Sequence, residues 1–201
     1  GRRILNLQRE PSRIIGEYNK TAMDNKGLAI RIYVGQGLEY WSPKTIADIG
    51  CGGSETAAAM IAKNFAAIGC QPIVYAMDNQ VWDGVVYRPF TSYNPGTVQS
   101  HLFISSRVPE VLQDDIPTLQ KWLWVHDICC WERLKPEIAE KIDAIICLSQ
   151  WHAGHLKRVY PFLKDASIVS FEDDEKTYDD LWTTHVYEYD GTPLRRLPKI
   201  A

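Results

Sequence analysis

The sequence predicts an α/β fold built on a doubly wound, mostly parallel β-sheet. Short runs rich in β-branched and aromatic residues alternate with helix-like segments over about 140 residues, the pattern of consecutive β-α-β units. The chain has 201 residues, of which 45% are hydrophobic, enough for one large core. Because such sheets bind ligands at the carboxyl ends of their strands, the residues that follow each strand are the candidate site.

The first predicted strand is "LAIRIYV", residues 28–34, which stops at Gly35. A long loop, residues 35–53, is expected to follow and to end in Gly52-Gly53. From Ser54 onward apolar residues recur at helical spacing as far as Ile68, and Gly69 is placed to end that helix.

The remaining strands are predicted from similar apolar runs at 72–77, 84–90, 101–106, 121–127 and 143–149. The run at 84–90 follows an Asp-Gly pair, which predicts a hairpin or an edge strand. Helix-like segments separate the later runs at 108–113, 136–142 and 149–162. Beyond Pro161 the pattern weakens: 167–171 fits a strand, and 184–198 has the alternation of a hairpin.

One domain is expected over residues 28–201, with an irregular insertion at about 171–193 and an N-terminal extension at 1–27. The first residue is Gly1 and not a methionine. We therefore expect a processed form or a piece of a longer protein.

Composition argues against several functional classes. The formal net charge of -3 and the pI near 6.0 give no general attraction to nucleic acid. The five cysteines form no C-x-x-C pair, which favours a reducing compartment over a disulfide framework or a zinc site. No apolar run is long enough to span a bilayer, and the polar N-terminus lacks the core of a signal peptide. We expect a cytoplasmic protein without a transmembrane segment and without a nucleic-acid partner.

The segment "DIGCGGSE", residues 48–55, is open to two interpretations. A methyltransferase that uses S-adenosylmethionine needs a strand leading directly into a loop with three spaced glycines. Here Ser54 stands at the third glycine position, and too few residues separate Pro43 from Asp48 for a buried strand. The acidic residue expected near the ribose would be Asp78, 30 positions beyond Asp48, where about 20 are typical.

The second interpretation makes Gly52-Gly53 the end of a loop at a helix N-terminus. Two glycines let the backbone approach a ligand, and the free amides favour an anion such as a diphosphate. Ser54 is expected to cap this helix, and Glu55 to complement its dipole. A simple turn with a cap fits the same pattern equally well.

Later motifs favour the second interpretation. The segments "GGSETAAAMIA", "SRVPEVL", "KWLWVHDICCWERL" and "DAIICLSQWHAGHLKRVYP" occur in an order and spacing that resemble the N-terminal domain of retaining GT-B glycosyltransferases of the family 4 type. The similarity covers residues 28–162. It implies a Rossmann-like domain, the N-terminal, acceptor-side half of a GT-B fold, whose second domain is absent from this chain.

The resemblance also implies roles for particular residues. His126 matches a catalytic histidine that approaches the donor sugar, and Gly52 and Gly53 match a loop that faces the diphosphate and the acceptor. The other positions implied to bind donor or acceptor are Ser54, Glu55, Arg107, Asp127 and Ser149. The implied partners are a nucleotide-sugar and an acceptor hydroxyl of open class, with no cofactor and no metal. His152 and His155 share a helical face, but no third ligand for a metal is visible.

Three functions follow as hypotheses. The leading one is sugar transfer from a nucleotide-sugar with retention, and this chain alone is expected to be nearly inactive. The alternatives are a methyltransferase that uses the "DIGCGG" loop and a non-catalytic binding domain with the same fold.

Overall fold

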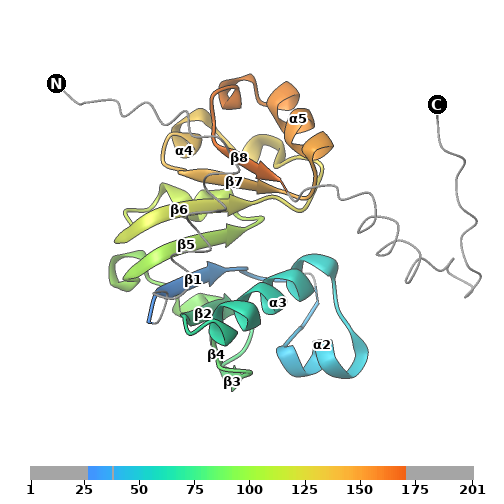
Figure 1. Cartoon of the computed structure of the whole chain (residues 1–201), viewed down its shortest axis with the longest axis vertical. Helices are drawn as coiled ribbons and strands as arrows, with labels where there is room; N and C mark the ends of the chain where they lie inside the picture. Colours follow the sequence, from blue (N-terminus) through green and yellow to red (C-terminus); the bar gives the residue numbers. More distant parts are fainter. Residues whose placement is uncertain (1–26, 38, 171–201) are drawn as a thin grey trace, which may run out of the picture.

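The computed structural model describes residues 27–37 and 39–170. Within these residues, eight strands form one sheet in the order β3-β4-β2-β1-β5-β6-β7-β8 (Figure 1). Their bounds are β1 Ala29–Tyr33, β2 Gln71–Ala76, β3 Gln80–Trp82, β4 Val85–Pro89, β5 Ser100–Ser106, β6 Thr118–Trp124, β7 Ala144–Cys147 and β8 Ile168–Ser170. The expected extension, apart from Gly27, the insertion at 171–193 and the hairpin at 184–198 lie outside the described residues.

The sheet is parallel except where β3 pairs with β4, which confirms the predicted α/β class and mostly parallel sheet. From β1 the chain moves outward through β2 to β4, then returns to the other side of β1 and continues through β5, β6, β7 and β8. The direction of winding therefore reverses between β1 and β5. In open α/β sheets this reversal opens a crevice at the carboxyl ends of the two strands.

The part of the chain that the structure describes has four α-helices in its connections: α2 Pro43–Ile49, α3 Gly53–Ala67, α4 Pro136–Ala139 and α5 Gln150–Val159. Short 3-10 helices occupy Phe90–Ser92, Pro95–Thr97, Pro109–Gln113, Trp131–Arg133 and Pro161–Leu163. The helix-like segment predicted at 108–113 is thus a 3-10 turn, and the one predicted at 149–162 divides into α5 and a 3-10 turn. The described residues contain no helix with the length and apolarity that a membrane span needs.

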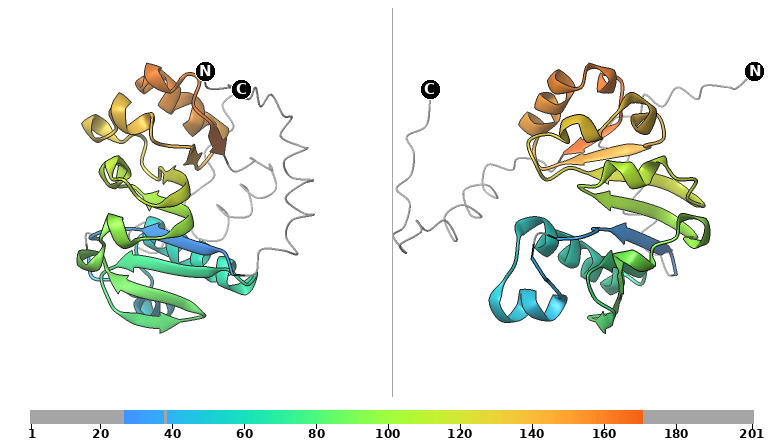
Figure 2. Two further views of the ribbon diagram at one scale, coloured as in Figure 1. Left: turned by 90° about the vertical axis from the view of Figure 1, so that its left-hand side faces the viewer. Right: turned by 180° about the vertical axis from the view of Figure 1, so that it is seen from behind.

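Two apolar clusters cover opposite faces of the sheet. Neighbouring residues on β5 belong to different clusters: Ile104 packs with the α3 side chains, whereas Phe103 packs with Leu156 of α5. Because side chains alternate along a strand, α3 covers one face while α4 and α5 cover the other. Figure 2 shows α3 on the β1–β2 half and α4 and α5 on the β7–β8 half.

The edge of the sheet beside β4 is a tight hairpin, as the sequence predicts. Asp83 and Gly84 join β3 to β4, and both have positive φ angles, of 49° and 77°. Left-handed conformations at both central residues suit two-residue hairpin turns, and they explain the Asp-Gly pair. The short strand β3 itself was not predicted.

The expected loop at 35–53 is wrong in its second half, because residues 43–49 form α2. Ser42 is the N-cap, and its hydroxyl accepts a hydrogen bond from the Thr45 N–H at 3.1 Å. Pro43 fits the first turn, and Gly50 ends the helix with a φ of 81°. The residues before Asp48 are therefore helical, and the strand that precedes the glycine segment is β1.

Strand β6 allows a direct test of the sheet, because it carries a buried and an exposed leucine. Leu123 has no exposed surface, whereas Leu119 is 76% exposed. We expect Leu123→Ala to lower the free energy of unfolding by about 2–5 kcal/mol through the cavity it leaves. Leu119→Ala is the control, with an expected change within about 0.5 kcal/mol. Urea denaturation measures both, and equal losses in the two variants would contradict the assignment of β6.

Candidate functional site

The start of α3 forms one wall of the site. Gly52 is the N-cap, and its carbonyl accepts from the Thr56 N–H at 3.0 Å. The expectation that Ser54 caps this helix is wrong: the helix begins at Gly53, two residues earlier than a cap at Ser54 would place it, so Ser54 lies inside the first turn. Its hydroxyl instead donates to Glu55 Oε2 at 2.7 Å.

The carboxylate of Glu55 folds back over the N-cap. A Cβ atom built on Gly52 would lie only 2.4 Å from Glu55 Oε2, whereas one built on Gly53 would meet nothing within 4 Å. A negative charge is favourable here because it faces the positive end of the helix dipole. The α3 N-terminus is therefore partly neutralised by its own side chain.

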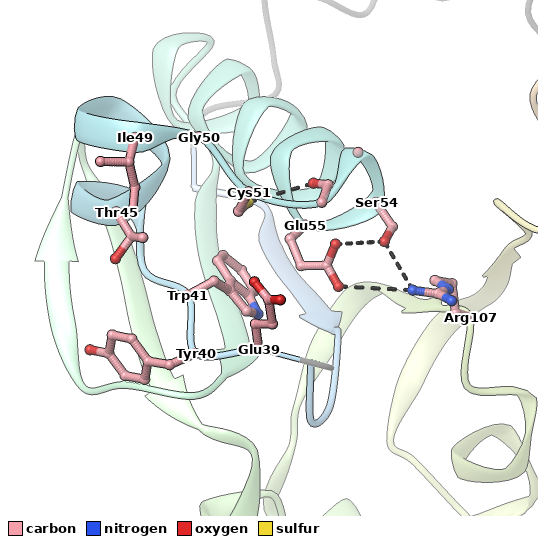
Figure 3. A pocket seen from close by; sticks show the side chains of 12 residues that line it. Glu39, Tyr40, Trp41, Thr45, Ile49, Gly50, Cys51, Ser54, Glu55 and Arg107 are labelled. Atoms are coloured by element: carbon pink, nitrogen blue, oxygen red, sulfur yellow. Dashed lines mark hydrogen bonds and ion pairs between the residues drawn. The ribbon is translucent and has the colours of Figure 1, made fainter. Parts of the chain in front are cut away.

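Arg107 connects α3 to the ends of β5 and β6. Its Nε donates to Asp127 Oδ2 at 2.8 Å, its Nη1 donates to Ser54 Oγ at 3.1 Å, and the same Nη1 lies 3.8 Å from Glu55 Oε1. Figure 3 shows the guanidinium directed at the first turn of α3. Four residues that the sequence predicts for the site, Ser54, Glu55, Arg107 and Asp127, thus form one polar cluster.

The backbone of Arg107 is strained. Its φ angle is +67°, in the left-handed region that non-glycine residues seldom occupy. The Arg107 N–H donates to the Trp124 carbonyl at 2.9 Å. This hydrogen bond continues the β5–β6 pairing by one residue and holds Arg107 in its left-handed conformation. Strain of this kind concentrates at functional sites, where the surrounding contacts determine the geometry.

His126 and Asp127 follow β6, which ends at Trp124. The His126 ring lies against the Trp124 indole, with centroids 4.4 Å apart and planes inclined by 37°. Burial, aided by the positive charge of Arg107, lowers the pKa of His126 to about 4. His126 is therefore neutral near pH 7, and its imidazole can both donate and accept hydrogen bonds.

Ser149 has a local role. It is the N-cap of α5, and its hydroxyl accepts from the His152 N–H at 3.1 Å. It lies at the same edge of the sheet as the other predicted residues, one position beyond Leu148, which follows β7.

His155 of the H-x-x-H pair stacks on Trp151, with ring centroids 5.2 Å apart. Across the described part of the chain, no three His, Cys, Asp or Glu side chains are grouped as metal ligands.

A cavity of about 440 Å³ opens beside the polar cluster, between α2 and the first turn of α3 (Figure 3). The predicted residues in its lining are Gly52, Gly53, Ser54, Glu55 and Arg107. The opposite wall was missed by the sequence prediction and comprises Glu39, Tyr40, Trp41, Thr45 and Ile49, together with Gly50 and Cys51. The sequence did contain one signal for this wall, the aromatic pair Tyr40-Trp41, which lies between glycines in the loop after a strand.

Two aromatic residues fix that wall in place. Trp41 is buried in the core, where its ring meets Tyr87 edge-on at 6.5 Å. Tyr40 is exposed, and its hydroxyl donates to Asp78 Oδ2 at 2.7 Å. This bond lowers the pKa of Asp78 and raises that of Tyr40. Asp78, the residue that a methyltransferase would use for ribose, therefore binds the cavity wall.

Comparison of the chain with models of known protein families, with curated proteins and with solved structures gives no match. The candidate site therefore rests on its own geometry: a strained arginine that joins two strand ends to a helix N-terminus, beside a cavity lined by carboxylates and aromatic rings.

The lowered pKa of His126 predicts an acid-sensitive contribution to stability. Between pH 6.5 and about 4 the unfolded chain binds a proton at this residue while the folded protein does not, so stability falls as the pH falls. Between neutral pH and pH 4, we expect the free energy of unfolding of His126→Gln to fall by on the order of 2 kcal/mol less than that of the wild type. Urea denaturation at several pH values measures it. His101→Gln is the control, because His101 is exposed and lies near the start of β5, at the end of the sheet away from His126. Equal pH dependence in wild type and His126→Gln would contradict the assignment.

Proposed function

We propose that this domain binds the acceptor of a glycosyl transfer reaction in the cavity beside Arg107. The observation that carries the proposal is the combination of groups in that cavity. Carboxylates of Glu39 and Glu55, the guanidinium of Arg107 and the rings of Tyr40 and Trp41 line one space of about 440 Å³. This volume lies within the range of small-molecule sites.

These groups match a neutral, polyhydroxylated ligand. Carboxylate oxygens accept hydrogen bonds from hydroxyl groups, and the guanidinium donates to them, so each ligand hydroxyl can be satisfied in both directions. The exposed ring of Tyr40 offers apolar area for the C–H surface of a sugar ring. A saccharide combines these two kinds of surface.

The charges favour such a ligand over a diphosphate in this cavity. Glu39 and Glu55 both carry negative charge there, and Arg107 is already paired with Asp127 at 2.8 Å. An anion would meet repulsion from two carboxylates with one partly neutralised cation to offset it. We therefore assign the acceptor to the cavity, and the donor nucleotide-sugar to the open side of the cluster, toward His126.

In the proposed reaction, the acceptor oxygen forms a bond to the anomeric carbon while the bond from that carbon to the diphosphate breaks. The acceptor proton leaves with the released nucleoside diphosphate. The protein contributes chiefly by positioning the acceptor against the donor sugar. His126, neutral near pH 7, donates a hydrogen bond to the donor sugar.

Titration of the isotope-labelled chain with a panel of mono- and disaccharides tests the proposal. We expect at least one saccharide to shift the nuclear magnetic resonance signals of the Trp41 indole N–H and the Arg107 Nε–H. S-adenosylmethionine is the comparison ligand. Absence of any shift with saccharides, or shifts of these signals with S-adenosylmethionine alone, would count against the proposal and, in the second case, for a methyltransferase.

The planar guanidinium of Arg107 bonds Asp127 and Ser54 at the same time, which a lysine could not do. Arg107→Lys keeps the positive charge but cannot contact Asp127 and Ser54 together, so we expect saccharide affinity to fall about tenfold. Arg133→Lys is the matched control, because Arg133 also forms a forked pair, with Glu110, and does not line the cavity. Calorimetry or the same titration gives both affinities. Equal weakening in the two variants would remove Arg107 from the binding site.

A further inference from the structure

The indole N–H of Trp41 is a buried donor at the wall of the cavity. The Trp41 side chain is only 2% exposed and is among the residues that line the cavity. In the part of the chain that the structure describes, Trp41 Nε1 has no hydrogen-bond partner. Buried indole N–H groups usually have one, because an unpaired donor in the interior costs free energy. This donor therefore needs an acceptor that the described residues do not supply.

The Trp41 ring is held in one orientation, so it cannot turn to find an acceptor elsewhere. Tyr87 meets the ring edge-on, with centroids 6.5 Å apart. The next residue, Ser42, is 6% exposed and caps α2, where its hydroxyl accepts from the Thr45 N–H at 3.1 Å. A buried ring on an anchored backbone has little room for another rotamer, because protein interiors are close-packed. The direction of the N–H is therefore fixed.

A glycine keeps side-chain atoms away from the nitrogen-bearing edge of this ring. A Cβ atom built on Gly37 would lie 3.0 Å from Trp41 Cδ1, 3.3 Å from Trp41 Nε1 and 2.9 Å from the Glu39 carbonyl oxygen. Gly37 does not have the left-handed backbone that favours glycine, so its conformation does not explain the residue. A larger residue would have to displace the carbonyl or the indole edge. Gly37 therefore leaves the N–H uncovered by a side chain of its own.

The carboxylate of Glu39 complements the Trp41 N–H. Glu39 is exposed and lines the same cavity, and Figure 3 shows its carboxylate near the nitrogen-bearing edge of the Trp41 ring. An exposed side chain reorients readily, so a small group can enter between the carboxylate and the N–H. The indole only donates hydrogen bonds, and an ionised carboxylate only accepts them. A hydroxyl group fits both, because its oxygen accepts from Trp41 while its hydrogen is donated to Glu39.

We propose that Trp41 and Glu39 form a hydroxyl-recognition pair, in which Trp41 is the residue that determines which position of the ligand must carry a free hydroxyl. An ether oxygen at that position satisfies Trp41 but leaves Glu39 without a donor, and a deoxy position satisfies neither. Sites built to bind a hydroxyl discriminate strongly against ligands that lack it. That the hydroxyl belongs to a sugar rests on the proposed function, whereas the pair itself would recognise any polyol.

Nuclear magnetic resonance of the full chain with ¹⁵N-labelled indoles tests the pair without a sugar, with glycerol as the probe. We expect glycerol to move the Trp41 N–H signal to lower field in a saturable way. The comparison probe is 1,2-dimethoxyethane, whose ether oxygens accept but cannot donate, and we expect its affinity to be lower by about tenfold or more. Trp131 and Trp151, which are 61% and 62% exposed, are internal controls whose signals should only drift linearly with either additive.

Substitution of Glu39 separates the pair from the N–H alone. In Glu39→Ala the hydroxyl loses its acceptor, so we expect the preference for glycerol over 1,2-dimethoxyethane to fall below about twofold. Glu137→Ala is the matched control, because Glu137 is an exposed glutamate on α4 that does not line the cavity. It should keep the wild-type preference. Equal loss of preference in both variants would remove Glu39 from the pair and overturn the proposal.

Replacement of Trp41 by 3-(3-benzothienyl)alanine, in which sulfur takes the place of the N–H, tests whether the donor is unpaired in the free protein. Because no bond is lost, we expect the urea midpoint of unfolding to equal or exceed that of the wild type. A lower midpoint would mean that the N–H already has a partner, and would overturn the proposal. So would a Trp41 signal that ignores glycerol or responds equally to both probes. If glycerol binds as expected but every saccharide fails, the proposed function is refuted and the hydroxyl-recognition pair stands.

Discussion

The guanidinium of Arg107 is the group on which the geometry of the candidate site depends. Its bonds to Asp127 and to Ser54 tie together the ends of β5 and β6 and the first turn of α3. Strand β5 pairs with β1 at the reversal of winding, whereas α3 belongs to the half of the sheet built from β1, β2 and β4. Arg107 therefore links the two halves of the domain at the edge where such folds bind ligands.

The importance of this arginine lies in geometry more than in stability. The side chains of Arg107 and Asp127 are 34% and 35% exposed, and partly exposed ion pairs stabilise folded proteins only weakly. The left-handed backbone of Arg107 also disfavours folding slightly. A weakly stabilising pair at a strained residue is better explained by the orientation it gives to a ligand-binding surface than by the fold.

The sequence predicted the parts of the fold that burial determines. Strands other than β3 were recognisable because buried parallel strands are continuous apolar runs, and Arg107 follows the end of one such run. His126 and Asp127 were chosen through the resemblance to glycosyltransferases. Helix α2 was missed because seven residues are too few to show a helical period, and only the Ser42-Pro43 start and the Gly50 stop indicate it. The cavity wall was missed for a related reason. The positions of Tyr40 and Trp41 depend on contacts with Asp78 and Tyr87, which are distant in sequence.

The most direct measurement is a double-mutant cycle between Arg107 and Asp127. The free energies of unfolding of Arg107→Gln, Asp127→Asn and the double variant isolate the energy of their contact. A direct, oriented pair at 2.8 Å predicts a favourable coupling of about 1 kcal/mol. Additive effects, with a coupling below about 0.3 kcal/mol, would show that the pair does not form in solution and would contradict its place at the centre of the site.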